Sequence, residues 1–554
     1  MTSRSRDNEC YDYVIVGAGP SAMGLLYGLL VDHLPPFSIC IVDQGDDSHD
    51  DTTGDPKDWY AASHIRSSKS VYQIFSTITN RVVDLPIGKG LGGTSNINAT
   101  LCMPPLASDL ESWPSPWKEN LLIHVQEIQS VLKNNEVLQG AHGSCSNPSS
   151  FPFKEKSSLD IMTGVPTLAT KSDGGTSSKF EYVRRNYFDG LVEPLLKNNP
   201  HLKDSVVFLL GSQVQRIIMD ESNAAAKGLV YSSRNGELCT IHARKEVIVC
   251  AGAIESPILL QLSGVTLGGQ VGLHLKDQVL IPRVFFATSM EYTKCKTVNG
   301  IRALGHWREG RDVLQVAILD TSTIQSIVPT TVAMAVRRNC NGFLFSQTWK
   351  RVFEFIYLVF KGLVSWTLWC MPVQRLVESY TVTTLVFLMH PVSEGSVRIR
   401  PRDNRESQDE LMRRDVDITV NVNYLQDQKD IETLRRCWNS TCQDGRATEI
   451  FPRWMFQPVA QIFFSWNWFQ GFCRLFSQPY YHFCCSCRMK TTGRDNWVVD
   501  SSLTVCNHSR LRVCDASVFP HTVSNPPALT CAALGYGLAK ILVATVEKDK
   551  VCSK

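Results

Sequence analysis

The chain has 554 residues, 43% of them hydrophobic and 20% charged, which is typical of a globular protein long enough for two domains. Lysine and arginine number 56 against 53 aspartates and glutamates, so the charge balance gives no reason to expect a nucleic-acid partner. The 19 cysteines lack the paired spacing of zinc sites. We therefore expect free buried thiols and no bound metal.

The N-terminal segment gives the first structural signal. Residues 1–10 are polar and contain no secretory apolar core, which predicts an intracellular, cytoplasmic protein. Residues 13–16 and 37–42 are short apolar runs that flank an apolar helical stretch over 23–31. Two strands and a helix within about 30 residues are typical of a parallel βαβ unit.

The turn after the first predicted strand has the pattern Gly17-x-Gly19-x-x-Ala22. Gly17 allows the tight turn, and Gly19 lets the backbone approach a pyrophosphate at the positive end of the following helix. Asp43 ends the second strand, where its carboxylate can bind ribose hydroxyls. The residues of this predicted dinucleotide site are Gly17, Gly19, Pro20, Ser21, Ala22 and Asp43.

A second glycine-rich stretch covers residues 88–98. Its four glycines and two hydroxyl residues cannot bury an apolar face, but their backbone N–H groups can close on a phosphate or a flat polar ring. Two such loops in one chain indicate a large, extended cofactor. Flavin adenine dinucleotide (FAD) is the natural candidate.

The remaining segments predict a nucleotide-binding domain in three pieces. Residues 136–180 are rich in small polar residues and should form an exposed excursion, whereas 205–285 carry strands at 206–210, 214–219 and 246–250 and a helix over 256–262. Alternating strands follow, for example at 381–389 and 395–400. We expect a FAD-binding domain of 1–110, 205–285 and 491–554, a lid excursion of 111–204, and an inserted substrate-binding domain of 286–490.

One segment, 352–371, is mostly apolar and aromatic, and is about long enough to span a bilayer. Glu354 and Lys361 interrupt it and argue against a span. We expect a buried helix or a flap over an apolar substrate, with contact to a membrane surface as the alternative.

Four motifs resemble those of the glucose–methanol–choline (GMC) oxidoreductase family of flavoenzymes. They occur in the family's order at 88–98, 252–265, 271–277 and 511–520, and the resemblance covers essentially the whole chain. Thr266 replaces a usual glycine, and Gln278 stands where histidine is frequent. The resemblance implies a Rossmann-like α/β FAD-binding domain of the glutathione-reductase type, with an inserted α+β domain containing an antiparallel sheet.

The same resemblance implies the cofactor contacts. In the family, a covalent flavin link uses a histidine near the first motif. Asn96 and Asn98 stand there instead, so we expect non-covalent FAD. The further cofactor-binding residues implied are Gly92, Gly93, Thr94, Ser95, Asn98, Val214, Asp515 and Ala516.

Alcohol oxidation needs a base for the hydroxyl proton while hydride leaves the carbinol carbon for flavin N5. Residues 481–489 resemble the family's catalytic-histidine segment, which makes His482 the candidate base. Asn525, in an Asn-Pro pair before the last helix, fits the family's second catalytic position, with His521 as its rival. The aromatic stretch before His482 favours a hydrophobic or ring-shaped alcohol.

The predicted function is oxidation of a primary or secondary alcohol, with electrons passing to oxygen or another acceptor, in a specialised biosynthetic pathway. Two alternatives stay open on the residues alone. One is a lyase of the same family that keeps its flavin without net oxidation. The other is a flavoprotein without catalytic activity.

Overall fold

The computed structural model describes most of the two ends of the chain and parts of its middle. The described residues are 7–31, 37–46, 56, 72–76, 81–139, 159–163, 165–172, 181–220, 222, 224–287, 301–309, 312–319, 381–402, 411–440, 447–449, 468–493 and 496–552. The apolar segment 352–371 and the aromatic residues 454–466 lie outside them. The predictions made for those two segments therefore stay predictions.

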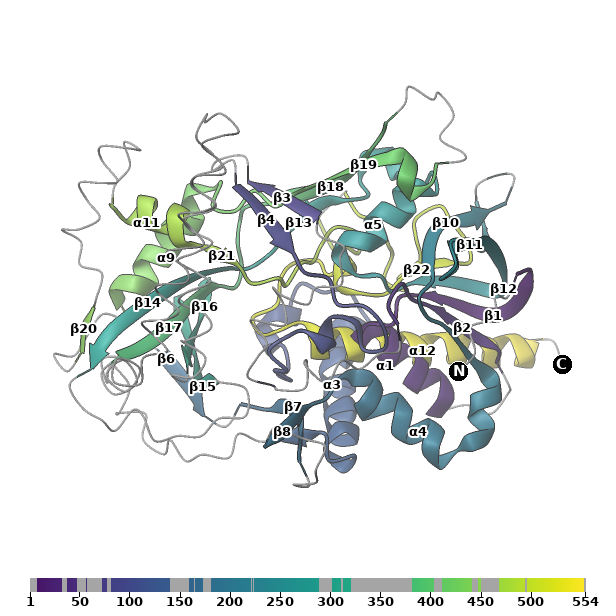
Figure 1. The fold of residues 1–554 in the computed structure, drawn as a ribbon, viewed down its shortest axis with the longest axis horizontal. Coiled ribbons are helices and arrows are strands. Elements are labelled where there is room, and N and C mark those ends of the chain that lie inside the picture. Colours follow the sequence, from purple (N-terminus) through teal and green to yellow (C-terminus); the bar gives the residue numbers. More distant parts are fainter. Residues whose placement is uncertain are drawn as a thin grey trace.

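A seven-stranded sheet forms one half of the molecule (Figure 1). Its central strand β1 pairs in parallel with β2 and β12, β2 pairs in parallel with β9, and β22 adds to β12. This is the Rossmann-like α/β sheet that the sequence predicted. The strands are β1 (Glu9–Val16), β2 (Ile39–Val42), β9 (Val206–Leu209), β10 (Gln213–Met219), β11 (Ala226–Ser232), β12 (Leu238–Val249) and β22 (Leu511–Val513).

Three helices cover this sheet. Helix α1 (Pro20–Val31) is buried around most of its circumference, as expected of an apolar helix with no polar stripe. It packs closely on α12 (Ala528–Cys552), because a Cβ added to Gly24 would lie 1.9 Å from the carbonyl oxygen of Ala532. Helix α3 (Trp117–Asn134) packs on the other side of α12. The apolar part of α12, Ala528–Val546, is as long as a membrane span, but 72% of it is buried in this contact region.

A second sheet, antiparallel, forms the other half. Its strand order is β20-β14-β17-β16-β15-β6, with β21 beside β14. Helices α9 (Gln428–Ser440) and α11 (Trp468–Phe476) lie on one face, as Figure 1 shows. The strands are β6 (Leu159–Thr163), β14 (Val279–Ala287), β15 (Ile301–Glu309), β16 (Asp312–Leu319), β17 (Thr381–Leu388), β20 (Ala447–Glu449) and β21 (Gln478–Pro479).

Successive side chains along these strands point to opposite faces of the antiparallel sheet. Val279 and Ile281 pack in the cluster under the helices with Trp438. Leu280, between them, and Phe387 of β17 belong to a different cluster on the opposite face. That opposite face also touches the first half of the molecule, and it carries the residues that approach the candidate site.

A third sheet lies between the two halves. It has the order β13-β18-β19-β3-β4 and packs against α5 (Gly252–Leu262) through β18. A small sheet of β5, β7 and β8 completes the fold. The strands are β3 (Tyr72–Ser76), β4 (Arg81–Leu85), β5 (Leu138–Gln139), β7 (Thr167–Lys171), β8 (Tyr182–Arg184), β13 (Leu273–Leu275), β18 (Gly395–Pro401) and β19 (Val416–Asn421).

The structure corrects the expectation that 136–180 is an exposed excursion. Strand β6 joins the antiparallel sheet beside β15, and Thr167, Leu168 and Ala169 of β7 are completely buried. Their neighbours come from distant segments, which composition alone does not reveal.

Candidate active site

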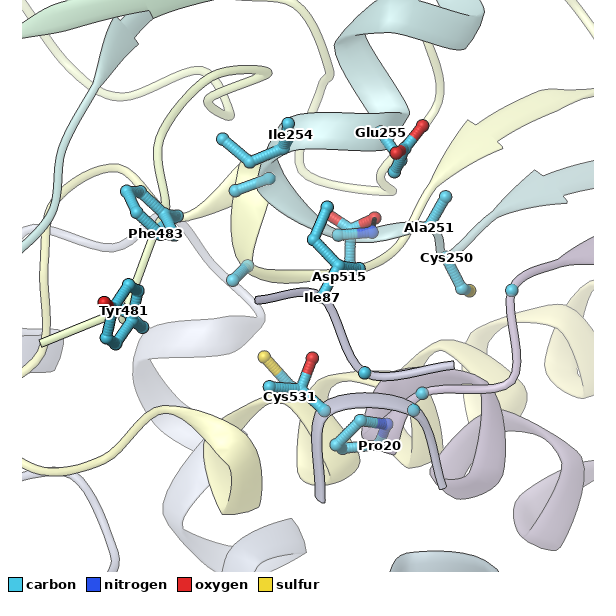
Figure 2. A pocket seen from close by; sticks show the side chains of 18 of the residues that line it. Pro20, Ile87, Cys250, Ala251, Ile254, Glu255, Tyr481, Phe483, Asp515 and Cys531 are labelled. Carbon is cyan, nitrogen blue, oxygen red and sulfur yellow. Dashed lines mark hydrogen bonds between the residues drawn. The ribbon is translucent and has the colours of Figure 1, made fainter. Parts of the chain in front are cut away.

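A cavity of about 300 Å³ extends between the parallel sheet and the antiparallel sheet. In Figure 2, Cys250, Ala251 and Glu255 lie at one side of it, Tyr481 and Phe483 at the other, and Asp515 and Ile87 between them. The cavity is therefore elongated, and its wall is assembled from both glycine loops and from the segment that contains His482. Of the residues predicted from the sequence, it is lined by Gly17, Gly19, Pro20, Ser21, Asp43, Gly93, Thr94, Asn98, Val214, His482, Asp515 and Ala516.

The first glycine loop has two glycines with different roles. Gly17 has φ +93°, and a Cβ there would lie 2.6 Å from the carbonyl oxygen of Cys250 in the neighbouring strand connection. Gly19 has no atom within 4 Å of a Cβ position, and it lines the cavity. Gly17 thus makes the turn, whereas Gly19 leaves space for a ligand. Ala22 is buried in α1 and does not line the cavity.

The second glycine loop closes directly on the first. The Gly92 N–H donates to the Ala18 carbonyl at 2.8 Å, and a Cβ on Gly93 would lie 2.7 Å from the Cα of Gly19. Gly92 and Ser95 are inside the loop and do not line the cavity; the Ser95 hydroxyl donates to the Gly92 carbonyl at 2.6 Å. The two loops therefore form one cradle.

Asp43 joins the two loops. Its Oδ2 accepts the Ala18 N–H at 2.9 Å, and its Oδ1 accepts the N–H groups of Gly45 and Gly90, each at 2.7 Å. Burial raises the pKa of this carboxyl, and the three donors oppose that rise. Asp43 does line the cavity, but in the structure its carboxylate organises the loops. Ribose binding by this residue stays a prediction.

Asp515 has the same kind of structural role on the opposite wall. Its Oδ2 accepts the Gly252 N–H at 2.8 Å and the Ser256 hydroxyl at 2.5 Å, and its Oδ1 accepts the Ser517 N–H at 2.8 Å. It therefore caps the start of α5 and the turn that begins at Ala516. Val214 lines the cavity from β10, where it pairs with Tyr231 of β11.

An ion pair in the cavity wall escaped the sequence analysis. Arg413 holds both carboxylate oxygens of Glu255, at 2.6 and 2.9 Å. Burial raises the pKa of Glu255, against the opposing charge of Lys89, and lowers the pKa of Arg413 to about 10. The two residues are 158 positions apart, so no local pattern predicts the pair.

Breaking this pair should destabilise the protein. Arg413→Met is expected to lower the free energy of unfolding by about 2–3 kcal/mol, because Glu255 would be left as a buried charge without its guanidinium partner. Denaturant unfolding measures the loss. Adding Glu255→Gln in the same chain should recover part of it. An equal loss in the double variant would show that the ion pair is not the cause.

His482 lies in a loop that Asp277 holds. The Asp277 carboxylate accepts the backbone N–H groups of His482 at 2.7 Å and Tyr481 at 3.2 Å, and the Tyr424 hydroxyl at 2.5 Å. Tyr481 has φ +63°, a conformation that costs a non-glycine residue about 1–2 kcal/mol. The Asp277 contacts therefore stabilise a strained turn that presents His482 to the cavity.

The imidazole of His482 is itself well supported. Its Nδ1 lies 2.7 Å from Oε1 of Gln278, and the Tyr480 ring packs against the imidazole, tilted by 41°, with a centroid distance of 3.8 Å. Burial lowers the pKa of His482 to about 3, because the charged form would lose its hydration. The ring is therefore neutral near pH 7 and able to accept a proton.

Removing the loop anchor should affect both stability and activity. Asp277→Asn is expected to cost about 2 kcal/mol of unfolding free energy, because one amide oxygen cannot accept all three donors. The turn at Tyr481 would loosen, and flavin reduction by substrate should slow about tenfold. Thermal unfolding and anaerobic reduction rates measure the two effects. Tyr424→Phe removes one donor only. It is the control and should change the unfolding free energy and the reduction rate less than Asp277→Asn does.

Asn525 is buried beside the cavity but does not line it, whereas Pro526 does. Its Nδ2 donates to the Pro104 carbonyl at 2.7 Å, and its Oδ1 lies 3.0 Å from both His306 Nε2 and Gln315 Nε2. Its predicted contact with substrate stays a prediction. The rival, His521, lies outside the cavity wall, with Nε2 2.7 Å from the Ser112 hydroxyl.

Side-chain contacts connect Asn525 to His482. Gln315 donates to Asn525, and the Tyr480 hydroxyl lies 3.4 Å from Gln315 Oε1, while the Tyr480 ring contacts the His482 ring in a tilted arrangement. Gln315 and His306 come from adjacent antiparallel strands, β16 and β15, and both are buried. The only sequence signal for them is a polar residue in an apolar strand, which does not reveal its partners.

Comparison with known proteins identifies the family whose motifs the sequence resembles. Residues 11–166 and 184–280 match the N-terminal family model of GMC oxidoreductases, and residues 391–535 match the C-terminal model. A GMC oxidoreductase family protein of Malassezia sympodialis is 25% identical over 97% of this chain and 92% of the relative.

Solved structures show the same fold at lower identity. Pyridoxine 4-oxidase from Mesorbium loti superposes with a TM-score of 0.65 at 18% identity, over 96% of this chain and 98% of that one. A fungal aryl-alcohol oxidase superposes with a TM-score of 0.61 at 17% identity, over 98% of this chain and all of the other.

Proposed function

The chain belongs to the GMC oxidoreductase family and is therefore an FAD-dependent oxidoreductase, and on that basis we propose that it oxidises an apolar primary or secondary alcohol, with His482 as the base. The observation that carries this proposal is the position of a half-buried, neutral imidazole in the wall of the elongated cavity.

The cavity wall fits FAD. Gly19 and Gly252 line it, and no atom stands within 4 Å of a Cβ position on either, so backbone is exposed to a ligand at both loops. Pro20, Ser21 and the start of α1 would hold the pyrophosphate, and Thr94 and Asn98 would lie along the ribitol and ring. The Asn96 side chain bonds within its own loop, through the Lys89 and Leu91 carbonyls, which supports non-covalent binding.

The proposed reaction divides between the cofactor and two side chains of the protein. Bound FAD would supply the oxidising group that takes hydride from the carbinol carbon. His482 would accept the hydroxyl proton, for which its ring is available in the neutral form near pH 7. Asn525 would orient the substrate oxygen through its side-chain NH₂ group. Among the described residues, this group donates to one acceptor, the Pro104 carbonyl.

The wall around His482 supports an apolar substrate. The described residues there are apolar or aromatic, and the charged residues of the cavity wall are engaged elsewhere: Asp43 and Asp515 by backbone N–H groups, Glu255 and Arg413 by each other. A charged substrate would meet no partner in this part of the wall, and burying an unpaired charge is costly. The lining residues near the base are Ala99, Leu101, Leu280, Phe387, Tyr480, Tyr481, Phe483, Pro526 and Pro527.

An anaerobic titration of the purified yellow protein tests this function. Alcohols from sugars to aryl carbinols and sterols are added, and loss of the oxidised-flavin absorbance is followed. Bleaching by aryl or alicyclic carbinols at low concentration, with sugars ineffective, is the expected result. Bleaching by sugars alone would refute the apolar substrate class. A yellow protein that no alcohol bleaches would refute alcohol oxidation and favour the lyase alternative.

A further inference from the structure

We propose that Gln278 is a positioning residue that keeps the imidazole proton of His482 on Nδ1, so that Nε2 is the atom that takes the substrate's hydroxyl proton. The proposal rests on the proposed function for the identity of the base. Gln278 stands at a position where similar sequences frequently have histidine. The evidence for its role is hydrogen-bond geometry.

The orientation of the Gln278 amide is determined by its surroundings. Its Nε2 donates to the Val523 carbonyl at 2.6 Å and to the Met389 carbonyl at 3.1 Å. Carbonyl oxygens cannot donate, so a flipped amide would set its oxygen against two other oxygens and lose both bonds. Gln278 is 1% exposed, and water cannot readily replace them. The amide oxygen therefore has to point toward His482.

The tautomer of His482 follows from that orientation. Gln278 Oε1 lies 2.7 Å from His482 Nδ1, and an oxygen facing a ring nitrogen at this distance needs the proton on the nitrogen. A neutral imidazole carries one ring proton, so Nε2 has a lone pair. Within the part of the chain that the structure describes, no group hydrogen-bonds Nε2, and His482 lines the cavity.

The ring cannot easily turn out of this orientation. The Tyr480 ring packs against the imidazole at a centroid distance of 3.8 Å, and the Tyr480 backbone N–H donates to the Gln278 carbonyl at 3.0 Å. Asp277 holds the backbone of the next two residues. The dipeptide Asp277–Gln278 thus fixes the loop through one residue and the ring through the other.

A neutral amide acts differently from a carboxylate at this position. Both accept the Nδ1 proton, but a carboxylate would also stabilise the imidazolium and raise the pKa of the base. Gln278 leaves the low pKa caused by burial in place. The Val523 carbonyl lies two residues before Asn525, so the same amide also ties the base to the loop of the second predicted catalytic residue.

Two variants separate tautomer control from simple packing. Gln278→Leu removes both the acceptor and the amide donor. Gln278→Glu keeps an acceptor toward His482 and adds a charge, but it also loses the two Nε2 bonds to the Val523 and Met389 carbonyls, so its pH profile is the informative readout rather than its rate at one pH. We expect Gln278→Leu to slow anaerobic flavin reduction about 100-fold at every pH, because the ring loses both its preferred tautomer and its orientation. We expect Gln278→Glu to move the acidic limb of the reduction-rate profile upward by about one pH unit or more and to recover rate at alkaline pH.

The titratable groups against His482 are Tyr480 and Asp277, and neither is altered in these variants. FAD content and the unfolding temperature establish that each variant is folded. Wild-type rates in Gln278→Leu would overturn the proposal. Equal losses in both variants with an unmoved pH profile would also overturn it, because they would indicate packing alone.

A direct readout needs no substrate. In holoprotein labelled with ¹⁵N-histidine, the signal missing from His482→Ala identifies His482 among the 13 histidines. We expect its Nδ1 to show the protonated shift and its Nε2 the unprotonated shift, with both averaged in Gln278→Leu. The opposite tautomer in the wild type would overturn the proposal even if alcohols bleach the flavin. The expected tautomer with no bleaching would instead refute only the proposed function.

Discussion

His482→Ala is expected to slow flavin reduction by alcohol about 1,000-fold while FAD stays bound, because the variant removes the proton acceptor and leaves the glycine cradle intact. The measurement is anaerobic rapid mixing of holoprotein with the best alcohol of the panel. His521→Ala is the matched control, because His521 is the rival candidate and lies outside the cavity wall. Near wild-type reduction in His482→Ala, or a comparable loss in His521→Ala, would reassign the base.

The pH dependence of the wild type should show the same residue. Burial lowers the pKa of His482 to about 3, so the neutral form is present well below the ordinary histidine value of about 6.5. The main acidic fall in the rate of flavin reduction should therefore come as pH approaches 3. Burial also raises the pKa of Asp277, which holds the His482 loop, to about 7, so a smaller step near pH 7 is expected and should be absent from Asp277→Asn. A main limb centred near 6.5 that persists in Asp277→Asn would show that the imidazole is better hydrated than its burial indicates.

The shift also has a consequence for stability. Between about pH 3 and 6.5 the unfolded chain binds a proton at His482 that the folded protein does not bind. Protonation of His482 in the unfolded chain therefore lowers the free energy of unfolding progressively as pH falls from about 6.5 to about 3, and it has no such effect above 6.5. His482→Ala should lose less stability than the wild type across this window.

Gly17→Val is expected to leave no FAD-loaded folded protein, with the free energy of unfolding reduced by about 4 kcal/mol or more. Gly17 has φ +93°, which a β-branched residue avoids, and its Cβ would lie 2.6 Å from the Cys250 carbonyl oxygen. The strand connection after β12 would have to move, and the cradle would open with it. Soluble yield, FAD absorbance and denaturant unfolding measure the effect.

Gly19→Val is the matched variant two residues away. No atom lies within 4 Å of its Cβ position and its φ is not left-handed, so the fold should persist. The added side chain would occupy the cavity, and FAD affinity should fall about 10- to 100-fold, as for an overpacked contact. Fluorescence titration of apoprotein with FAD measures this change. If Gly19→Val unfolds as Gly17→Val does, or binds FAD normally, the inference that FAD occupies the space beside Gly19 is wrong.

Local patterns account for the parts of the fold that were predicted correctly. The strand, glycine turn, helix and acid from β1 to Asp43 lie within one short stretch, and each follows from the residues beside it. The same holds for the alternating strand β17, which runs over Thr381–Leu388 where 381–389 was predicted. The buried strand β7 was missed although it pairs with the nearby strands β5 and β8, because its burial also depends on more distant contacts such as the Leu168 N–H bond to the Thr100 carbonyl.

The functions of individual polar residues depended on distant contacts. Asp43 was predicted as a ribose ligand, and the structure shows that its carboxylate joins the two glycine loops through the N–H groups of Ala18 and Gly90. Gln278 was noted only as a departure from a motif, although it holds His482, 204 positions away. An acceptor or donor in a sequence says nothing about which partner it meets.

By itself, the sequence determined the cofactor class, the family and the candidate base, because glycine turns and the motif around His482 are local and depend on backbone conformation or on short spacing. Only the tertiary structure decided how that base is held and in which state. The pKa and tautomer of His482 depend on burial and on Gln278, and the position of Asn525 depends on His306 and Gln315 from the antiparallel sheet. These contacts join segments hundreds of residues apart, and hydrogen-bond direction and desolvation exist only once those segments are packed together.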